Sequence, residues 1–155
     1  MSVVDDDEIL YRRVPFSSGN SPYYRCQPDG TIRLSSTAFN DRNFRISVDR
    51  ARLNRDDPKM TQTTPDDGVV SLLAQVIRVN SLPGFDEHGK PKEPYLLDII
   101  PAPLPDKPAH AEIVAYPEIR GNVFDRLKKM LTQLITWEIY PADCRESHEG
   151  LHLGE

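Results

Sequence analysis

The sequence predicts an α+β fold, in which a single small domain has a mostly antiparallel sheet and one clear amphipathic helix near the C-terminus. Two observations on patterning support this class. Short runs at 31–34 and 44–48 alternate apolar and polar residues, and one later segment repeats apolar residues at helical spacing. In addition, 155 residues are the length of one ordinary domain.

The first strands are expected in the N-terminal third of the chain. Residues 8–14 are typical of a strand, and residues 1–7 of a flexible tail that precedes the domain. Residues 28–30, Pro-Asp-Gly, predict a turn, because proline presets one dihedral angle and glycine accepts a positive one. The runs 31–34 and 44–48 then alternate apolar and polar side chains, which predicts an antiparallel pair with one exposed face.

The middle of the chain is more ambiguous, because its most apolar segment fits two patterns. Its apolar side chains have helical spacing at first: Val69, Leu72, Leu73 and Val76. This spacing predicts a helix over about residues 67–74 that continues as extended chain. Residues 82–94 are predicted as a loop because of their glycine and proline turn signals. Strands are expected at 95–101 and 110–116, joined by a proline-rich connector.

The clearest helix is predicted over residues 122–136. Its apolar stripe consists of Val123, Leu127, Met130 and Leu134, widened by Phe124, Leu131 and Ile135. A short strand over 137–140 follows, so the domain is expected to extend from residue 8 to 141, with a polar tail over 142–155.

The charge and cysteine content restrict the class of protein. A net charge of -5 argues against a general nucleic-acid binder, which needs a basic surface. The N-terminus is acidic and does not resemble a signal peptide, and no apolar run reaches the ~20 residues of a membrane span. Cys26 and Cys144 form no paired motif. A cytoplasmic protein with two reduced thiols is therefore expected.

One enzymatic alternative rests on three residues in the order typical of ADP-ribosyltransferases. Arg12 would hold a diphosphate, Ser36 would position the ribose, and Glu112 would stabilise the developing oxocarbenium ion. These residue types are common, and short motifs of this kind discriminate weakly. An ordinary surface arginine and a capping serine are the simpler interpretation.

Metal binding and nucleophilic catalysis have weaker support. Cys144, His148 and His152 have a spacing that places them on one helical face, and Cys26 or a carboxylate is a possible fourth zinc ligand. The segment is polar and contains glycine, and no second cysteine pair is present, so neither a metal nor a cofactor is expected. His110 paired with a cysteine or serine lacks any local signature of a nucleophile.

Arginines crowd the first third of the chain and suggest a surface for a partner. The candidate partner-binding residues are Arg12, Arg33, Arg42, Arg45 and Arg50. If the predicted antiparallel strands neighbour each other, these residues form one positive face for another protein with an acidic surface, or for a phosphate-bearing ligand. The alternative is that the intervening aspartates neutralise them.

Five blocks, EILYRRVP, LSSTAFNDR, ISVDRARL, GVVSLLA and PDKPAHAEIV, carry a resemblance that spans roughly residues 8–116. Together they resemble a family of small uncharacterised bacterial proteins that share LYRR-P, SS-x-AF-x-D, SVDR and P-x-HA blocks. This chain differs in a longer loop at 80–94 and in the tail after Pro141. The resemblance implies a bacterial, cytosolic origin and transfers no catalytic residue, because no activity is known for the family.

The sequence therefore favours a non-enzymatic protein-interaction or accessory module of a larger bacterial assembly. The small size, the polar loops and the lack of a catalytic signature support this hypothesis. The ADP-ribosyltransferase-like enzyme stays as the alternative, and the positions of Arg12, Ser36 and Glu112 in space discriminate between the two.

Overall fold

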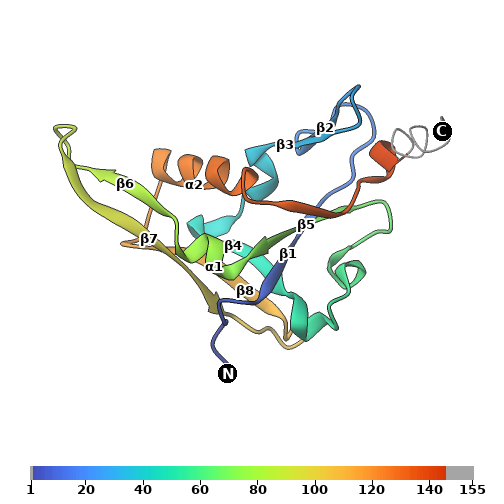
Figure 1. Ribbon diagram of the computed structural model, residues 1–155, viewed down its shortest axis with the longest axis horizontal. Coiled ribbons are helices and arrows are strands. Elements are labelled where there is room, and N and C mark those ends of the chain that lie inside the picture. The colour runs from blue at the N-terminus through green and yellow to red at the C-terminus, as the bar shows by residue number, and fades with distance from the viewer. Residues whose placement is uncertain (1, 146–155) are drawn as a thin grey trace.

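A curled antiparallel sheet forms the body of the protein in the computed structural model, which describes residues 2–145 (Figure 1). Its seven strands have the spatial order β6-β7-β8-β4-β1-β5-β9. Their bounds are β1 (Ile9–Val14), β4 (Ile46–Arg50), β5 (Gly68–Leu73), β6 (Ser81–Phe85), β7 (Pro91–Pro101), β8 (His110–Tyr116) and β9 (Thr136–Ile139). A separate hairpin pairs β2 (Tyr24–Cys26) with β3 (Ile32–Leu34). This small single domain with an antiparallel sheet and few helices agrees with the predicted α+β class.

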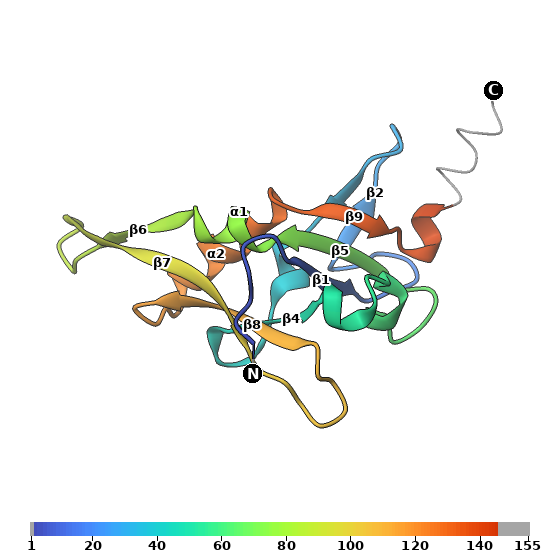
Figure 2. The ribbon, with the colours of Figure 1, turned by 60° about the horizontal axis from the view of Figure 1, so that its bottom comes forward.

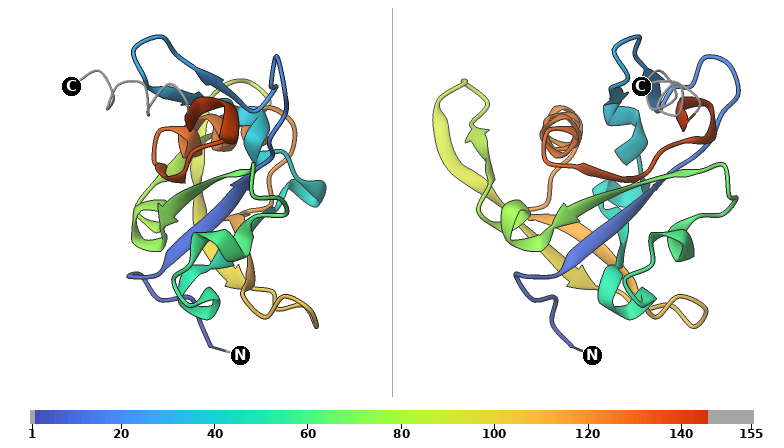
Figure 3. Two further views of the ribbon diagram at one scale, coloured as in Figure 1. Left: turned by 90° about the vertical axis from the view of Figure 1, so that its right-hand side faces the viewer. Right: turned by 45° about the vertical axis from the view of Figure 1, so that its right-hand side comes forward.

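The helices are short, and the longest lies against the concave face of the sheet (Figure 3). α1 (Ala74–Arg78) follows β5 directly, and α2 (Asn122–Thr132) lies between the β6–β7 hairpin and the β2–β3 hairpin. Four 3-10 turns complete the elements: η1 (Ser36–Phe39), η2 (Arg42–Phe44), η3 (Ala51–Asn54) and η4 (Pro58–Thr61). Within residues 2–145, no helix has the length and apolar character needed to cross a membrane.

The core fills the space between α2 and the concave face of the sheet. α2 buries Phe124, Leu127 and Leu131, which lie on one face of the helix. The sheet contributes buried aliphatic side chains from five strands: Leu10, Ile46, Val48, Val70, Leu72, Ile99 and Ile113. The predicted helix over 122–136 is too long, because α2 ends at Thr132, and Leu134 and Ile135 lie beyond it. Val123 and Met130 lie at the partly buried edge of the helix face.

Truncation of this helix face should destabilise the domain. The side chains of Leu127 and Leu131 have no exposed surface, so Leu127→Ala or Leu131→Ala leaves a cavity. We expect either change to lower the free energy of unfolding by about 2–5 kcal/mol in urea denaturation. Val123→Ala, at the edge of the same helix, is the control and should cost less. A loss of under about 1 kcal/mol for both leucines would contradict this packing.

The N-terminal strands differ from the predicted pairing. β1 and β8 lie where the sequence predicts strands, and residues 27–30 form the predicted turn, with Gly30 at φ 89°. However, the prediction that residues 31–34 and 44–48 pair with each other is wrong. β3 pairs with β2, whereas β4 pairs with β1 and β8. η1 and η2 separate them, and Asn43 and Phe44 have positive φ angles, so the chain changes direction before β4.

Two further segments are strands rather than a helix and a loop. The predicted helix over 67–74 is wrong, because its residues form β5. β5 is covered on both faces, so five successive residues are buried and the apolar run imitates helical spacing. The predicted loop over 82–94 is instead a hairpin of β6 and β7, which extends away from the body (Figure 2). Pro83 is tolerated there because β6 is an edge strand.

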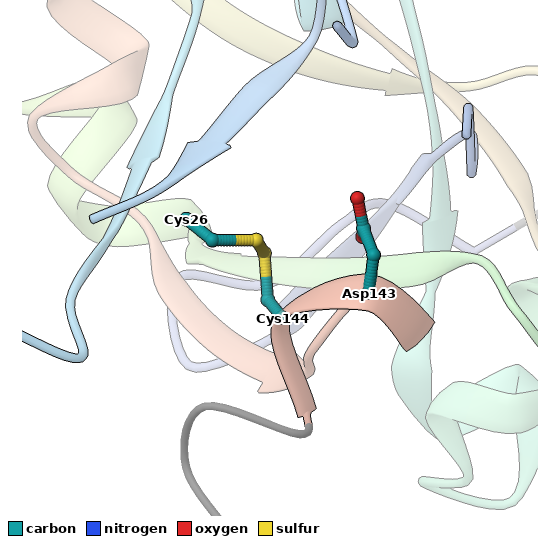
Figure 4. A group of neighbouring side chains, drawn as sticks. All are labelled: Cys26, Asp143 and Cys144. Carbon is teal, nitrogen blue, oxygen red and sulfur yellow. A yellow bond between two sulfur atoms is a disulfide. The ribbon is translucent and has the colours of Figure 1, made fainter. Parts of the chain in front are cut away.

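The two ends of the described chain are attached to the domain. Residues 2–7 do not behave as the predicted flexible tail, because Val4 is buried and the backbone oxygens of Ser2 and Val3 accept hydrogen bonds from Arg50. Residues 142–145 form a helical turn, and Cys144 bonds to Cys26 in a disulfide (Figure 4). The prediction of two reduced thiols is therefore wrong. The remainder of the predicted C-terminal tail lies outside the described residues.

Candidate functional site

Arg12, the first residue of the transferase alternative, joins three parts of the fold. From β1, its guanidinium donates to the backbone oxygens of Ala38 at 3.1 Å, Asn40 at 2.9 Å and Ser47 at 2.8 Å, and to the Asp41 carboxylate at 2.9 Å. These bonds link β1 to η1 and β4, and each of the three guanidinium nitrogens donates to an oxygen of the protein. Arg12 is therefore a structural arginine.

The Asp41 carboxylate beside Arg12 is held in its charged form. Burial alone would raise the pKa of Asp41, but the Ser47 amide, the Arg12 guanidinium and the Arg42 amide donate to the carboxylate and outweigh it. The pKa of Asp41 consequently lies below its usual value. The Asp41 carboxylate therefore supports the position of Arg12.

The other two residues of the transferase alternative lie apart from Arg12. Glu112 on β8 pairs with Arg45 at 3.4 Å, and Ser36 begins η1 and lines a different cleft from the one that contains Arg12. The described structure does not bring Arg12, Ser36 and Glu112 into one cleft. A shared site for a dinucleotide is therefore not supported.

The predicted arginine-rich face does not form as one surface. Arg50 is buried and pairs with Glu8 through two contacts of 2.7 Å, and Arg45 is paired with Glu112. Arg42 is exposed on η2, while Arg33 lies on the separate hairpin. Of the five candidate residues, only Arg33 and Arg42 keep a guanidinium without a described protein partner. The predicted arginine-rich face required β3 to lie beside β4, and these two strands do not pair in the structure.

A mixed-charge cleft of about 460 Å³ lies over β1, β4 and β8 and includes Arg12 in its wall. Asp49 on β4 stands opposite His110 on β8, and its carboxylate accepts a hydrogen bond from Thr61 at 2.9 Å. The Nδ1 of His110 lies 2.7 Å from the oxygen of Ala102, which accounts for one ring nitrogen. Both charge signs occur in the lining, so this cleft selects no particular ligand charge.

A second cleft, of about 820 Å³, lies between the β2–β3 hairpin and the C-terminal end of α2. We call it the basic cleft, because Arg25, Arg33 and Lys129 line it and its described lining contains no acidic residue. Hydroxyl groups lie around these cations: Ser21, Ser35, Ser36 and Thr132. The charged ends of the three basic side chains make no hydrogen bond or ion pair within residues 2–145.

Sequence reasoning found only Arg33 among these three cations, although a signal for Arg25 existed. The turn over 28–30 connects β2 and β3, so the positions before and after it pair across the hairpin. Arg25 and Arg33 are direct partners in this register. Lys129 gave no such signal, because it lies far away in the sequence on the exposed side of α2.

Several anchors hold the hairpin in place beside α2. Tyr24 and Leu34 are buried in the core, and the Trp137 side chain donates to the Ile32 oxygen at 3.3 Å. The Tyr24 hydroxyl donates to Asp143 at 2.8 Å; burial and this bond raise the pKa of Tyr24 to about 12. A two-stranded hairpin is only marginally stable alone, so these contacts organise the basic cleft.

The disulfide joins β2 of this hairpin to Cys144, and with Asp143 it makes the one group of possible metal ligands found among residues 2–145. The group contains Cys26, Asp143 and Cys144 (Figure 4). Thiolates bind metals, whereas the two sulfurs here are bonded to each other. The predicted spacing of Cys144 with His148 and His152 cannot be followed further, because both histidines lie outside the described residues.

Comparisons with family models, with curated proteins and with solved structures find no match to this chain.

Proposed function

We propose that this protein is a non-enzymatic interaction module that binds an acidic segment of a partner protein in the basic cleft. The observation that carries the proposal is the set of three cations, Arg25, Arg33 and Lys129, in a cleft without acidic lining or internal ion partners. On a chain of net charge -5, this cleft is a local positive site. Charge complementarity of this kind gives specificity and fast association.

The transferase alternative has less support, because Arg12 is committed to internal hydrogen bonds and does not share a cleft with Ser36. The proposed role as an accessory subunit of a bacterial assembly agrees with a small module that presents the basic cleft. A disulfide persists in oxidising compartments and is rare in the cytosol. The bond between Cys26 and Cys144 therefore supports an oxidising compartment over the expected cytoplasmic location.

The proposal is tested by binding of a fluorescein-labelled peptide rich in glutamate and aspartate, measured by fluorescence polarisation at low salt. We expect saturable binding that weakens as salt rises, since exposed charges are screened within a Debye length. Arg25→Glu with Arg33→Glu should reduce binding by at least about tenfold, because it reverses two of the three cations.

Arg42→Glu with Arg120→Glu is the matched control. It changes the net charge by the same amount, and both arginines are exposed outside the basic cleft. This control should bind like the unmodified protein. Equal losses in the two double variants would show that net charge alone attracts the peptide, and no binding to the folded unmodified protein would remove the proposal.

A further inference from the structure

The register of the β2–β3 hairpin places two arginines directly opposite each other. Arg25 and Arg33 are cross-strand partners, and both are exposed. Like charges at directly opposite positions of an antiparallel pair are destabilising. No carboxylate among the described residues relieves this pair, although most other arginines of the first third have an acidic partner. An anion bound between the two guanidinium groups would remove the repulsion.

The number of charges and donors in the cleft decides which anion fits best. A carboxylate carries one negative charge and two oxygens, so it pairs fully with one arginine fork. A phosphate monoester carries about -1.5 to -2 charges at pH 7 and three acceptor oxygens. Two guanidinium groups and the Lys129 ammonium match that charge and number of oxygens more closely, and nearby serine and threonine hydroxyls supply neutral donors.

We infer that the preferred occupant of the basic cleft is a phosphorylated serine or threonine side chain on a segment of the partner protein. This inference rests on the proposed function and names the chemistry that the cleft selects. The cleft also has apolar lining from Ile32, Leu34 and Ile135, which suits the neighbouring residues of a peptide chain.

Extended polyanions fit this site less well than a single phosphate group. A nucleic acid or an anionic membrane requires a broad basic surface. Here Arg25, Arg33 and Lys129 lie in one cleft of a chain with net charge -5, so the rest of the molecule repels a long polyanion. A single phosphate on a peptide reaches the cleft without approaching the acidic remainder.

The inference is tested with three peptides that differ at one position, which is serine, glutamate or phosphoserine, in an otherwise identical short sequence with leucine beside that position. Binding is measured by isothermal titration calorimetry with the disulfide-bonded protein. We expect the phosphoserine peptide to bind at least about tenfold more tightly than the glutamate peptide, because charge-assisted bonds to three oxygens replace those to two. Arg25→Glu with Arg33→Glu should remove this preference.

Each contrary outcome has a distinct meaning. If the glutamate and phosphoserine peptides bind equally well, the preference for phosphate is overturned and the proposed function stands. If neither peptide binds, the inference is overturned, while the proposed function is decided by the peptide rich in glutamate and aspartate. If inorganic phosphate displaces the phosphoserine peptide at a concentration equal to that of the peptide, the site binds free phosphate and the assignment to a peptide segment is overturned.

Discussion

Replacing Arg50 with methionine should lower the free energy of unfolding by about 3–5 kcal/mol, because it leaves the Glu8 carboxylate buried without its partner. The Arg50 Nε and Nη2 atoms each lie 2.7 Å from one Glu8 oxygen, and both residues are almost fully buried. Arg50 also donates to the backbone oxygens of Ser2 and Val3, so the change should release the N-terminal segment as well. Urea denaturation gives the measurement.

The double variant Glu8→Met with Arg50→Met separates the cost of an unpaired charge from the value of the pair. It leaves no buried charge, so its loss should be clearly smaller than that of Arg50→Met alone. Arg45→Ala is the control for an ion pair at the surface: Arg45 pairs with Glu112 at 3.4 Å and does not contact Glu8, so its loss should leave the melting temperature nearly unchanged. A double variant as unstable as the single one would contradict this account.

The Arg50–Glu8 pair should also make stability depend on pH. Burial alone would raise the pKa of Glu8, but the hydrogen bonds from Arg50 and the Asp5 amide, with the charges of Arg50 and Arg52, hold it below the model-compound value of 4.5. A lowered pKa in the folded state adds stability above pH 4.5, which is lost as the pH falls through the folded pKa. The difference between the unmodified protein and Arg50→Met should therefore narrow as the pH falls below that value.

Removing the disulfide should have a comparable effect. Cys26 and Cys144 are 118 residues apart, so the bond restricts the unfolded chain over most of its length. For a loop of this size, the chain-entropy estimate is about 4–5 kcal/mol. We expect Cys26→Ser with Cys144→Ser to lower the free energy of unfolding by about this amount, and the unmodified protein in excess dithiothreitol to match the variant.

A thiol count provides the companion measurement. Alkylation of the denatured, unreduced protein followed by mass spectrometry should detect no free thiol, since both cysteines are in the bond. Two alkylated cysteines, together with a serine variant as stable as the unmodified protein, would contradict the disulfide. Loss of hairpin contacts alone, without a fall in global stability, would show that the bond acts only locally on β2.

Local signals in the sequence were sufficient for several elements. The strand character of β1 and β8, the turn over 28–30 and the apolar stripe of α2 each depend on neighbours within a few residues. If residues 24–26 are also taken as a strand, the Pro-Asp-Gly turn predicts that Arg25 and Arg33 pair across the hairpin, as they do. None of these features requires contacts between distant parts of the chain.

The sequence by itself therefore determined the α+β class, the helix that covers the sheet and one of the three cations of the basic cleft. Tertiary structure decided the rest. Residues 68–73 form a strand that is covered on both faces. Arg12 and Arg50 have structural roles, because a loop and the N-terminal segment supply the oxygens that accept their hydrogen bonds. Long-range packing alone places Arg33 and Lys129 in the lining of one cleft, and it alone brings Cys26 to Cys144. Burial and charge pairing depend on which distant segments meet, and no local pattern of residues encodes that.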